Sequence, residues 1–144
     1  MSADSELIEK IFTLSRFLKG NMAYSNDLIH LSLLQLQALI FLHKTTNAQM
    51  RDIAEHFKIE MPTATDLIAK LVKNKLVQRK VDEKDRRLVR ISLTPQGQLL
   101  LTDAMRQRNK KLARILSYLS THEKEQLLAI LSLLIAKMEE EHEK

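Results

Sequence analysis

Hydrophobic residues recur at intervals of three and four along most of the chain, a spacing that predicts amphipathic helices. The first such stripe covers residues 5–22. Ser32 and Gln35 then have the spacing of a capping box, in which two residues exchange side-chain to backbone hydrogen bonds at a helix start. An apolar run to Leu42 follows. The pattern therefore predicts one helix over residues 5–22 and a second from Ser32 to about Leu42.

Two shorter helices follow, separated by a tight break. Thr46 and Gln49 repeat the capping-box spacing ahead of an amphipathic segment at residues 50–57. The next segment spans residues 62–74, and Pro62 suits its first turn, where the missing N–H of proline costs no hydrogen bond. A short helix, a tight turn and a second helix make a helix-turn-helix, whose second helix lies in the major groove of DNA.

The period of the pattern changes after this second helix. Residues 76–81 and 88–93 are short runs with β-branched side chains, and they flank a polar stretch at residues 82–87. This arrangement predicts a two-stranded hairpin with a charged loop. A charged hairpin directly after a helix-turn-helix is typical of a winged helix-turn-helix, in which the hairpin, or wing, reaches the DNA backbone and the neighbouring minor groove.

Two long helices complete the predicted order. The first is expected over residues 95–119, with a proline at its first position. Ser120 and Glu123 form another capping-box pair, and a last apolar stripe covers residues 123–138. This stripe and that of residues 5–22 are broader than one small domain can cover, so we expect both to pack in a dimer.

Composition agrees with one mostly helical domain. The chain has 144 residues, of which 44% are hydrophobic and 28% are charged, as is ordinary for a globular protein. It contains only 2 glycines, too few for a glycine-rich phosphate loop or a dinucleotide-binding motif. The absence of cysteine excludes disulfides, thiolate metal ligands and thiol nucleophiles.

We expect a cytoplasmic protein with no membrane segment. No apolar run approaches the roughly 18 residues that a membrane-spanning helix needs. The N-terminal residues carry acidic side chains where a signal peptide carries basic ones. Both features favour a soluble protein.

The net charge of +5 is concentrated in the middle of the chain. Residues 70–90 carry nine basic and three acidic side chains, a local net charge of +6, whereas residues 1–50 carry four of each sign. A basic block of this kind is the electrostatic footprint of a surface that binds a polyanion, although a solvated charged face gives the same pattern. Because the block coincides with the predicted wing, the DNA interpretation is favoured.

Three runs in the middle of the chain, residues 52–59, 63–79 and 82–97, resemble the MarR family of bacterial transcriptional regulators. The most specific element is Asp-x-Arg followed by Leu-Thr-x-x-Gly, here Asp85, Arg87, Leu93, Thr94 and Gly97. The resemblance covers essentially the whole chain. It implies a mainly α fold with an α+β wing, an obligate homodimer, a pseudo-palindromic DNA operator and, often, inhibition by a small aromatic or lipophilic anion.

On this basis we expect one MarR-type domain over residues 1–144. Residues 32–94 are expected to form the winged helix-turn-helix DNA-binding lobe, and residues 5–25 and 95–144 the dimerisation helices. The predicted DNA-binding residues lie on the second helix of the helix-turn-helix, the recognition helix, and on the wing. They are Pro62, Thr63, Thr65, Asp66, Lys70, Lys84, Asp85, Arg86 and Arg87.

These residues are expected to have different roles. The resemblance places Arg87 in the minor groove, and Asp85, two residues away, can hold its guanidinium. Lys84 and Arg86 are expected to contact phosphates rather than bases. A merely solvated polar face is the alternative for the recognition helix and for the wing.

Three positions depart from the family pattern. The usual arginine after the recognition-helix threonine is Asp66, which would repel phosphate or accept a hydrogen bond from cytosine. The usual glycine after that helix is Lys75, so we expect Asn74 to supply the left-handed residue that ends it. The usual N-cap serine or aspartate is Glu60, a poorer cap. These changes leave the fold intact and bear on the base preference.

A regulatory ligand would fit the junction between the dimerisation helices and the DNA-binding lobe, because pockets favour such boundaries. The helix after Ser32 and the long helix that starts at Pro95 are expected to line this junction. The candidate ligand-binding residues are Leu36, Ile40, Met105, Arg106 and Leu112, with Leu39 and Arg108 near them. Core packing is the alternative for the apolar members.

We interpret the chain as a sequence-specific DNA-binding transcriptional regulator, and as a repressor. A winged-helix module that binds another protein is the alternative, but it leaves the basic wing unexplained. No nucleophile–base pair stands out, so we expect no enzyme, no catalytic residue and no cofactor. No two of the five histidines lie three or four residues apart on one helix, so we expect no metal site.

Overall fold

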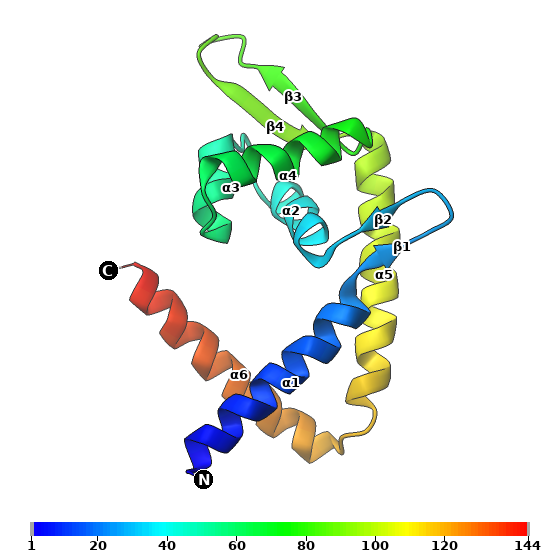
Figure 1. Ribbon diagram of the computed structural model, residues 1–144, viewed down its shortest axis with the longest axis vertical. Coiled ribbons are helices and arrows are strands. Elements are labelled where there is room, and N and C mark those ends of the chain that lie inside the picture. The colour runs from blue at the N-terminus through cyan, green and yellow to red at the C-terminus, as the bar shows by residue number, and fades with distance from the viewer. Residues whose placement is uncertain (1, 144) are drawn as a thin grey trace. The chain divides into compact units, whose positions relative to one another are not determined.

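The computed structural model describes residues 2–143, so residues 1 and 144 of the predicted domain lie outside the described part of the chain. The chain divides into two compact units, Met1–Arg108 and Asn109–Lys144. The helices and strands follow in the order α1 (Ala3–Met22), β1 (Tyr24–Ser25), β2 (His30–Leu31), α2 (Leu33–Lys44), α3 (Met50–Phe57), α4 (Met61–Lys73), β3 (Val77–Val81), β4 (Val89–Leu93), α5 (Pro95–Leu116) and α6 (Thr121–His142) (Figure 1).

The predicted fold class is confirmed, because the described chain is mostly helical and carries an antiparallel hairpin between α4 and α5. The capping boxes at Ser32 and Ser120 are also confirmed. One helix is shorter than expected, since α5 ends at Leu116 rather than at residue 119. From Ser117 to Leu119 each backbone N–H donates to the carbonyl three residues back, which tightens the chain into a turn.

A short ribbon of β1 and β2 was not predicted. Each strand has only two residues, too few for an alternating pattern, and Tyr24 pairs with Leu31. The Tyr24 hydroxyl donates a hydrogen bond of 2.6 Å to Oδ2 of Asp103 on α5. Burial raises the pKa of Tyr24, and the bond to Asp103 raises it further. The ribbon is thus tied to α5 by a contact between residues far apart in the sequence.

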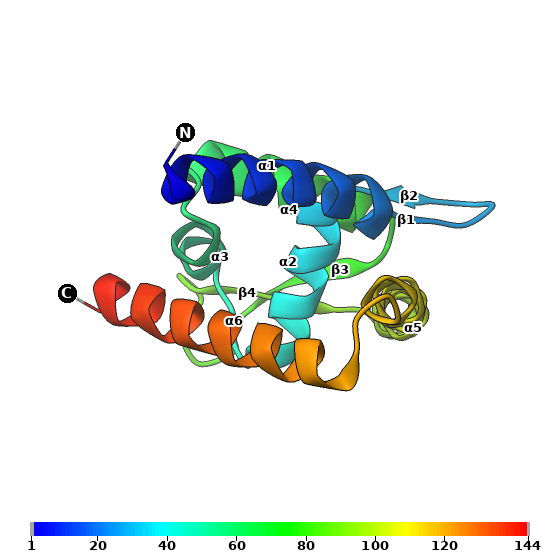
Figure 2. The ribbon, with the colours of Figure 1, turned by 90° about the horizontal axis from the view of Figure 1, so that it is seen from below.

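The hydrophobic core of the first unit is built around α2, which crosses the middle of that unit (Figure 2). The largest fully buried side chains come from α2, α3, α4, α5, the strands and the link between α4 and β3. They are Leu31, Leu36, Leu39, Ile53, Ile68, Leu71, Leu76, Val77 and Leu101. Leu and Ile residues at helical spacing bury one side of α4, and the side chains on its other side face solvent.

The wing consists of β3, β4 and the loop between them, and its register runs from Val77 opposite Leu93 to Val81 opposite Val89. The segment ahead of α3 joins its edge, because Ala48 forms an isolated bridge with Ile91. The Ile91 N–H donates to the Ala48 carbonyl at 2.8 Å. The wing is therefore hydrogen-bonded to the helix-turn-helix.

The capping box predicted at Thr46 is wrong. The N-cap of α3 is Gln49, whose backbone N–H donates to Oδ2 of Asp52 at 2.8 Å. Thr46 and Asn47 form a turn in which Asn47 is left-handed, and Ala48 then bridges to the wing, so the helix begins only after Gln49.

The end of α4 also differs from the prediction. Lys75, and not Asn74, takes the left-handed conformation, with φ of 61°. The Lys75 N–H donates to the Val72 carbonyl at 2.9 Å and the Leu76 N–H to the Leu71 carbonyl at 3.0 Å, the two bonds of a Schellman motif. Burial of Leu76 thus fixes the left-handed position one residue beyond the one that we predicted.

The Leu-Thr-x-x-Gly motif joins the end of α4 to the start of α5. The Thr94 hydroxyl donates to the Lys75 carbonyl at 2.6 Å and accepts the Gly97 N–H at 2.9 Å. A Cβ atom added at Gly97 would lie 2.0 Å from the Leu76 carbonyl oxygen. Glycine is therefore required at this close approach between helix and backbone.

Helices α1 and α6 have no buried residue within the described range. The exposed large apolar side chains of α1 are Leu7, Ile8, Ile11, Phe12, Leu14 and Phe17. Those of α6 are Leu128, Ile130, Leu131, Leu133, Leu134, Ile135 and Met138. No helix among residues 2–143 is long and apolar enough to cross a membrane.

Candidate nucleic-acid interface

The exposed side of α4 carries all five predicted recognition-helix residues. They are Pro62, Thr63, Thr65, Asp66 and Lys70. The opposite side is buried through Ala64, Leu67, Ile68 and Leu71. Helical geometry therefore separates a polar surface from the core, as the spacing predicts.

The start of α4 lacks a side-chain cap. The side chain of the N-cap residue Glu60 makes no capping hydrogen bond, in agreement with its prediction as a poor cap. One turn later, the Thr65 hydroxyl donates to the Met61 carbonyl at 2.9 Å. The Thr65 oxygen keeps lone pairs that can accept a hydrogen bond, so this side chain remains available to a polar ligand.

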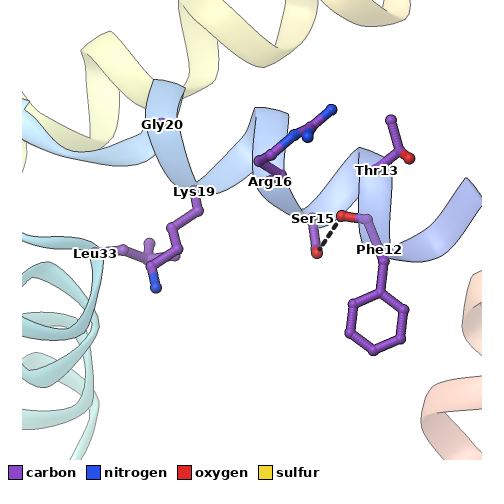
Figure 3. Close-up of a pocket in the computed structure, with 7 residues that line it drawn as sticks. All are labelled: Phe12, Thr13, Ser15, Arg16, Lys19, Gly20 and Leu33. Carbon is purple, nitrogen blue, oxygen red and sulfur yellow. Dashed lines mark hydrogen bonds between the residues drawn. The ribbon is translucent and has the colours of Figure 1, made fainter. Parts of the chain in front are cut away.

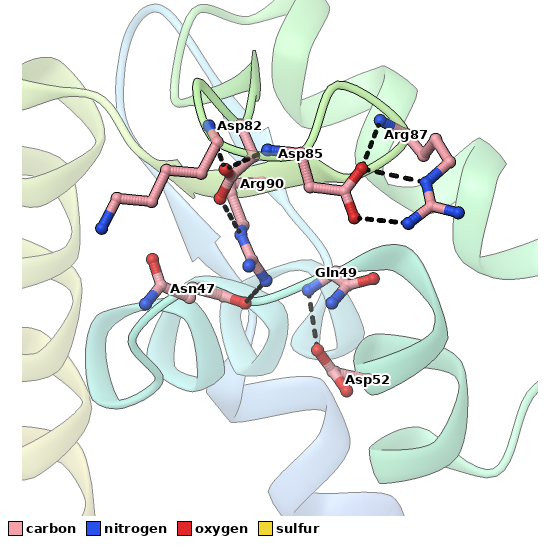
Figure 4. A network of polar contacts seen from close by, with 8 residues as sticks. Asn47, Gln49, Asp52, Asp82, Asp85, Arg87 and Arg90 are labelled. Atoms are coloured by element: carbon pink, nitrogen blue, oxygen red, sulfur yellow. Dashed lines mark hydrogen bonds and ion pairs between the residues drawn. The ribbon is translucent and has the colours of Figure 1, made fainter.

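The wing loop holds Arg87 in a defined position, as predicted. Arg87 donates from Nε to Oδ1 of Asp85 at 3.0 Å and from Nη2 to Oδ2 at 3.1 Å (Figure 4). The Arg87 side chain is nevertheless 90% exposed. The Arg87 side chain lowers the pKa of Asp85 below its ordinary value, with a further contribution from the Arg87 backbone N–H. The result is an ion pair that orients a cation without burying it.

A second ion pair lies where the strands of the wing meet its loop, and sequence reasoning missed it. Arg90 donates from Nε to Oδ2 of Asp82 at 3.2 Å and from Nη1 to the Asn47 carbonyl at 3.0 Å (Figure 4). These bonds connect β4 both to the wing loop and to the segment ahead of α3. Sequence reasoning had counted Arg90 only as part of the basic block. Its position on a strand, eight residues from an aspartate across a loop, is the signal that could have revealed the pair.

The second oxygen of Asp82 shapes the wing loop. Oδ1 accepts the backbone N–H groups of Lys84 at 2.8 Å and Asp85 at 3.0 Å. These hydrogen bonds lower the pKa of Asp82, that from Asp85 most, and the bond from Arg90 lowers it further. The carboxylate thus organises the loop that carries the exposed Lys84, Arg86 and Arg87.

The polar side of α4 and the wing belong to one compact unit, and α4 contacts β3 directly (Figure 1). The nine predicted DNA-binding residues lie on these two elements. Eight of them are exposed or carry an exposed charge, and Asp85, which is partly buried, orients Arg87. A polar helix face and a neighbouring cationic hairpin are both suited to contact one long polyanion.

The five candidate ligand-binding residues lie in different surroundings. Leu36 is fully buried, and Met105 packs against the core, as the core-packing alternative predicts. Arg106 pairs with Asp103 on its own helix. Leu112 belongs to the second unit.

Ile40, the remaining candidate, lines a cavity of about 600 Å³ formed by α2, α3 and α5. Rings from α2 and α3 gather there: Phe41 stacks on His56 with centroids 4.4 Å apart, and Phe57 lies edge-on to Phe41 at 6.0 Å. Lys44 and Arg108 also line the cavity. We call this space the α2–α3 cavity, and it offers aromatic surface together with positive charge.

A second cavity, of about 800 Å³, lies along α1 (Figure 3). Phe12, Arg16, Lys19 and Leu33 are among the residues that line it. In Figure 3, Phe12 and Lys19 point to the side of α1 on which Leu33 lies.

Residues 2–143 contain no group of three His, Asp or Glu side chains placed to hold a metal ion.

The fold and this interface together define a winged helix-turn-helix protein. The MarR family model matches residues 31–89. The chain is 30% identical over 111 residues to the uncharacterized HTH-type transcriptional regulator YfiV of Bacillus subtilis, which covers 77% of this chain and 69% of YfiV. It is 31% identical over 89 residues to the HTH-type transcriptional repressor MdtR of the same organism. This match covers 62% of this chain and 57% of MdtR.

Solved structures have the same fold. The transcriptional regulator SlyA is 22% identical, with a TM-score of 0.77 over 95% of this chain and 96% of that one. A mutant of S. aureus MepR bound to an oligodeoxyribonucleotide is 24% identical, with a TM-score of 0.61 over 96% of this chain and 99% of that one. The chain spans between about half and about two thirds of the length of the curated relatives that it matches. It belongs to the MarR family of transcriptional regulators.

Proposed function

We propose that this protein is a sequence-specific DNA-binding transcriptional regulator that acts as a homodimer on a pseudo-palindromic operator. The observation that carries the proposal is the exposed polar side of α4 beside a wing on which Asp85 orients the exposed Arg87. A recognition helix reads base edges in the major groove, and a wing arginine suits the narrow, electronegative minor groove.

The contacts divide into base reading and backbone binding. Thr63, Thr65 and Asp66 lie where they can meet base edges, and the Asp66 carboxylate can accept a hydrogen bond from the amino group of cytosine. The exposed cations Lys70, Lys84 and Arg86 are suited to phosphate oxygens. Pro62, at the start of the helix, contributes a contact surface without an N–H.

Dimerisation is supported by α1 and α6, whose exposed apolar side chains find no cover within their own units. Apolar surfaces of this extent mark interfaces. The cavity of about 800 Å³ along α1 opens on one of these helices, so a second copy is its proposed cover. The two recognition helices of a dimer can then meet successive turns of DNA, about 34 Å apart.

Repression is the proposed outcome of binding, supported by the relationship to the repressor MdtR. A dimer seated on an operator excludes other proteins from the same DNA. The S. aureus MepR mutant of the same fold was solved bound to an oligodeoxyribonucleotide, which supports DNA as the partner.

A small aromatic anion is the proposed effector, and the α2–α3 cavity is its proposed site. Phe41, His56 and Phe57 offer ring faces, while Lys44 and Arg108 bring positive charge to the same space. Salicylate, titrated against the protein–DNA complex, is expected to release the DNA and to raise the melting temperature of the free protein, since a ligand of the folded state stabilises it. Release without such a rise would contradict a specific pocket.

The alternative, a module that binds protein instead of DNA, is tested by the salt dependence of duplex binding. Each phosphate contact adds about 0.9 to the slope of log affinity against log salt concentration. We expect nanomolar to micromolar binding of duplex DNA with a slope of several units, measured by fluorescence anisotropy. Absence of duplex binding at about 50 mM salt would favour the protein-binding module.

A further inference from the structure

We propose that Asp82 and Arg90 are positioning residues that fix the wing against the helix-turn-helix and thereby direct Arg87, without contacting DNA themselves. This inference rests on the proposed function, since it concerns how the DNA-reading arginine is held. The carrying observation is an unbroken series of hydrogen bonds from the segment ahead of α3 to the tip of the wing (Figure 4).

The first link of the series joins the wing to the helix-turn-helix. The Arg90 guanidinium donates to the backbone carbonyl of Asn47, a residue whose φ of 59° places it in the left-handed region. The next residue, Ala48, accepts the N–H of Ile91. Two neighbouring residues of β4 therefore bind two neighbouring residues ahead of α3, so the wing cannot tilt about this edge without breaking both bonds.

The second link joins β4 to the wing loop. Arg90 and Asp82 are largely covered, with side chains 26% and 22% exposed, unlike the exposed pair at the tip. One oxygen of Asp82 accepts from Arg90, and the other accepts the backbone N–H groups of Lys84 and Asp85. Each Asp82 oxygen is thus engaged, and the carboxylate sets the course of the loop.

The third link reaches the reading residue. The backbone N–H of Asp85 is held by Asp82, and the Asp85 carboxylate holds the Arg87 guanidinium in a two-point contact. The direction of Arg87 therefore depends on Asp82 and, through it, on Arg90. The charge of Arg90 is matched by Asp82, so its expected contribution to phosphate binding is small.

This geometry separates a positioning role from a phosphate contact. Loss of a phosphate contact weakens binding to all duplexes and lowers the salt slope by about 0.9. Loss of positioning instead reduces the preference for sequences whose minor groove Arg87 reads, because narrow A·T grooves attract a correctly placed arginine. Lysine at position 90 keeps the charge but cannot make two directed bonds in a planar fork.

The probe is the duplex that the purified protein enriches from random DNA, compared with a copy whose base pairs under the wing are changed from A·T to G·C. Anisotropy titrations give the ratio of the two affinities and the salt slope. We expect Arg90→Ala, Arg90→Lys and Asp82→Asn each to reduce the ratio by at least about threefold, with the salt slope changed by less than about half a unit. In the Arg87→Ala background, Arg90→Ala should change the ratio by less than about 1.5-fold.

The matched control is Lys80→Ala, which removes an exposed cation directly opposite Arg90 in the hairpin register and should leave the ratio unchanged. A wild-type affinity ratio in Arg90→Lys would overturn the inference. So would an Arg90→Ala variant whose salt slope falls by about 0.9 while its affinity ratio is unchanged. A third contradicting result is a loss of the affinity ratio in the double variant equal to the sum of the losses from Arg90→Ala and Arg87→Ala. Thermal melts show whether each variant is folded. If Arg90→Ala is unfolded, the test uses Arg90→Lys and Asp82→Asn instead. Failure of the wild-type protein to enrich any duplex would instead contradict the proposed function.

Discussion

At the scale of single residues, the Asp85–Arg87 pair shows what a local motif can predict. The Asp85 carboxylate accepts both the backbone N–H and the guanidinium of Arg87, a local contact that the spacing of the two residues was enough to predict. The Asp82–Arg90 pair spans the wing loop, and the spacing of the two residues could have indicated it. The contact of Arg90 with the Asn47 carbonyl forms only because the hairpin packs against the helix-turn-helix, and the sequence pattern contains no direct sign of it.

The carboxylates of Asp82 and Asp85 should titrate below the ordinary aspartate value of about 3.9. A carboxyl whose pKa is lower in the folded than in the unfolded state stabilises the fold above the unfolded value, and this contribution is lost as pH falls through the folded pKa. The wing loop should therefore stay ordered at pH 7 and loosen below about pH 4. Carbon-detected NMR titration measures both values. Arg87→Ala should raise the Asp85 pKa toward the ordinary value, and an unchanged Asp85 pKa would contradict the observed pair.

At the scale of elements, the helices whose caps use neighbouring residues were predicted correctly, as at Ser32 and Ser120. The elements shaped by distant contacts were not. Helix α3 has the predicted bounds, but its N-cap is Gln49 instead of Thr46, because Ala48 pairs with the wing. The left-handed residue after α4 is Lys75 instead of Asn74, because Leu76 is buried. The two-residue strands β1 and β2 gave no periodic signal at all.

Gly97→Ala should destabilise the protein, because its Cβ would lie 2.0 Å from the Leu76 carbonyl oxygen and backbone would have to move. Overpacking of this kind costs about 1–3 kcal/mol, which thermal or urea unfolding measures. The matched control is Gly20→Ala in α1, where nothing lies within 4 Å of the added Cβ. Alanine in a helix is favoured over glycine by roughly 0.5–1 kcal/mol, so the control should be neutral or stabilising. Equal effects of the two substitutions would contradict the close approach at Gly97.

At the scale of the whole molecule, the sequence correctly predicted the order of helices and the wing, and it identified the apolar stripes of α1 and α6. It did not predict the α2–α3 cavity, because Phe41, His56 and Arg108 come from three different helices. The ligand-binding candidates Leu36, Met105 and Arg106 were chosen only because their helices were expected to line one junction. In the structure Leu36 and Met105 pack in or against the core, and Arg106 forms an ion pair with Asp103.

The chain should be dimeric at micromolar concentration, because the apolar surfaces of α1 and α6 need a partner. Analytical ultracentrifugation is expected to give twice the 16.7 kDa chain mass. Leu131→Asp should dissociate and destabilise the protein together, since a charge in that stripe would be buried without a partner. The control is Leu28→Asp, at a 95% exposed position on the β1–β2 ribbon, which should remain dimeric. A stable, folded wild-type monomer would contradict this account.

The central claim, that α4 and the wing read DNA sequence, is tested most directly by selecting binding sites from a random duplex library with the purified protein. We expect enrichment of an inverted repeat whose half-sites lie about 10 base pairs apart, centre to centre, bound at least about a thousandfold more tightly than random duplex at the same salt concentration. The double variant Thr65→Ala, Arg87→Ala should lose most of that preference while retaining salt-dependent binding to any duplex. Enrichment of no sequence, or the same affinity for the selected and the random duplex, would contradict the claim.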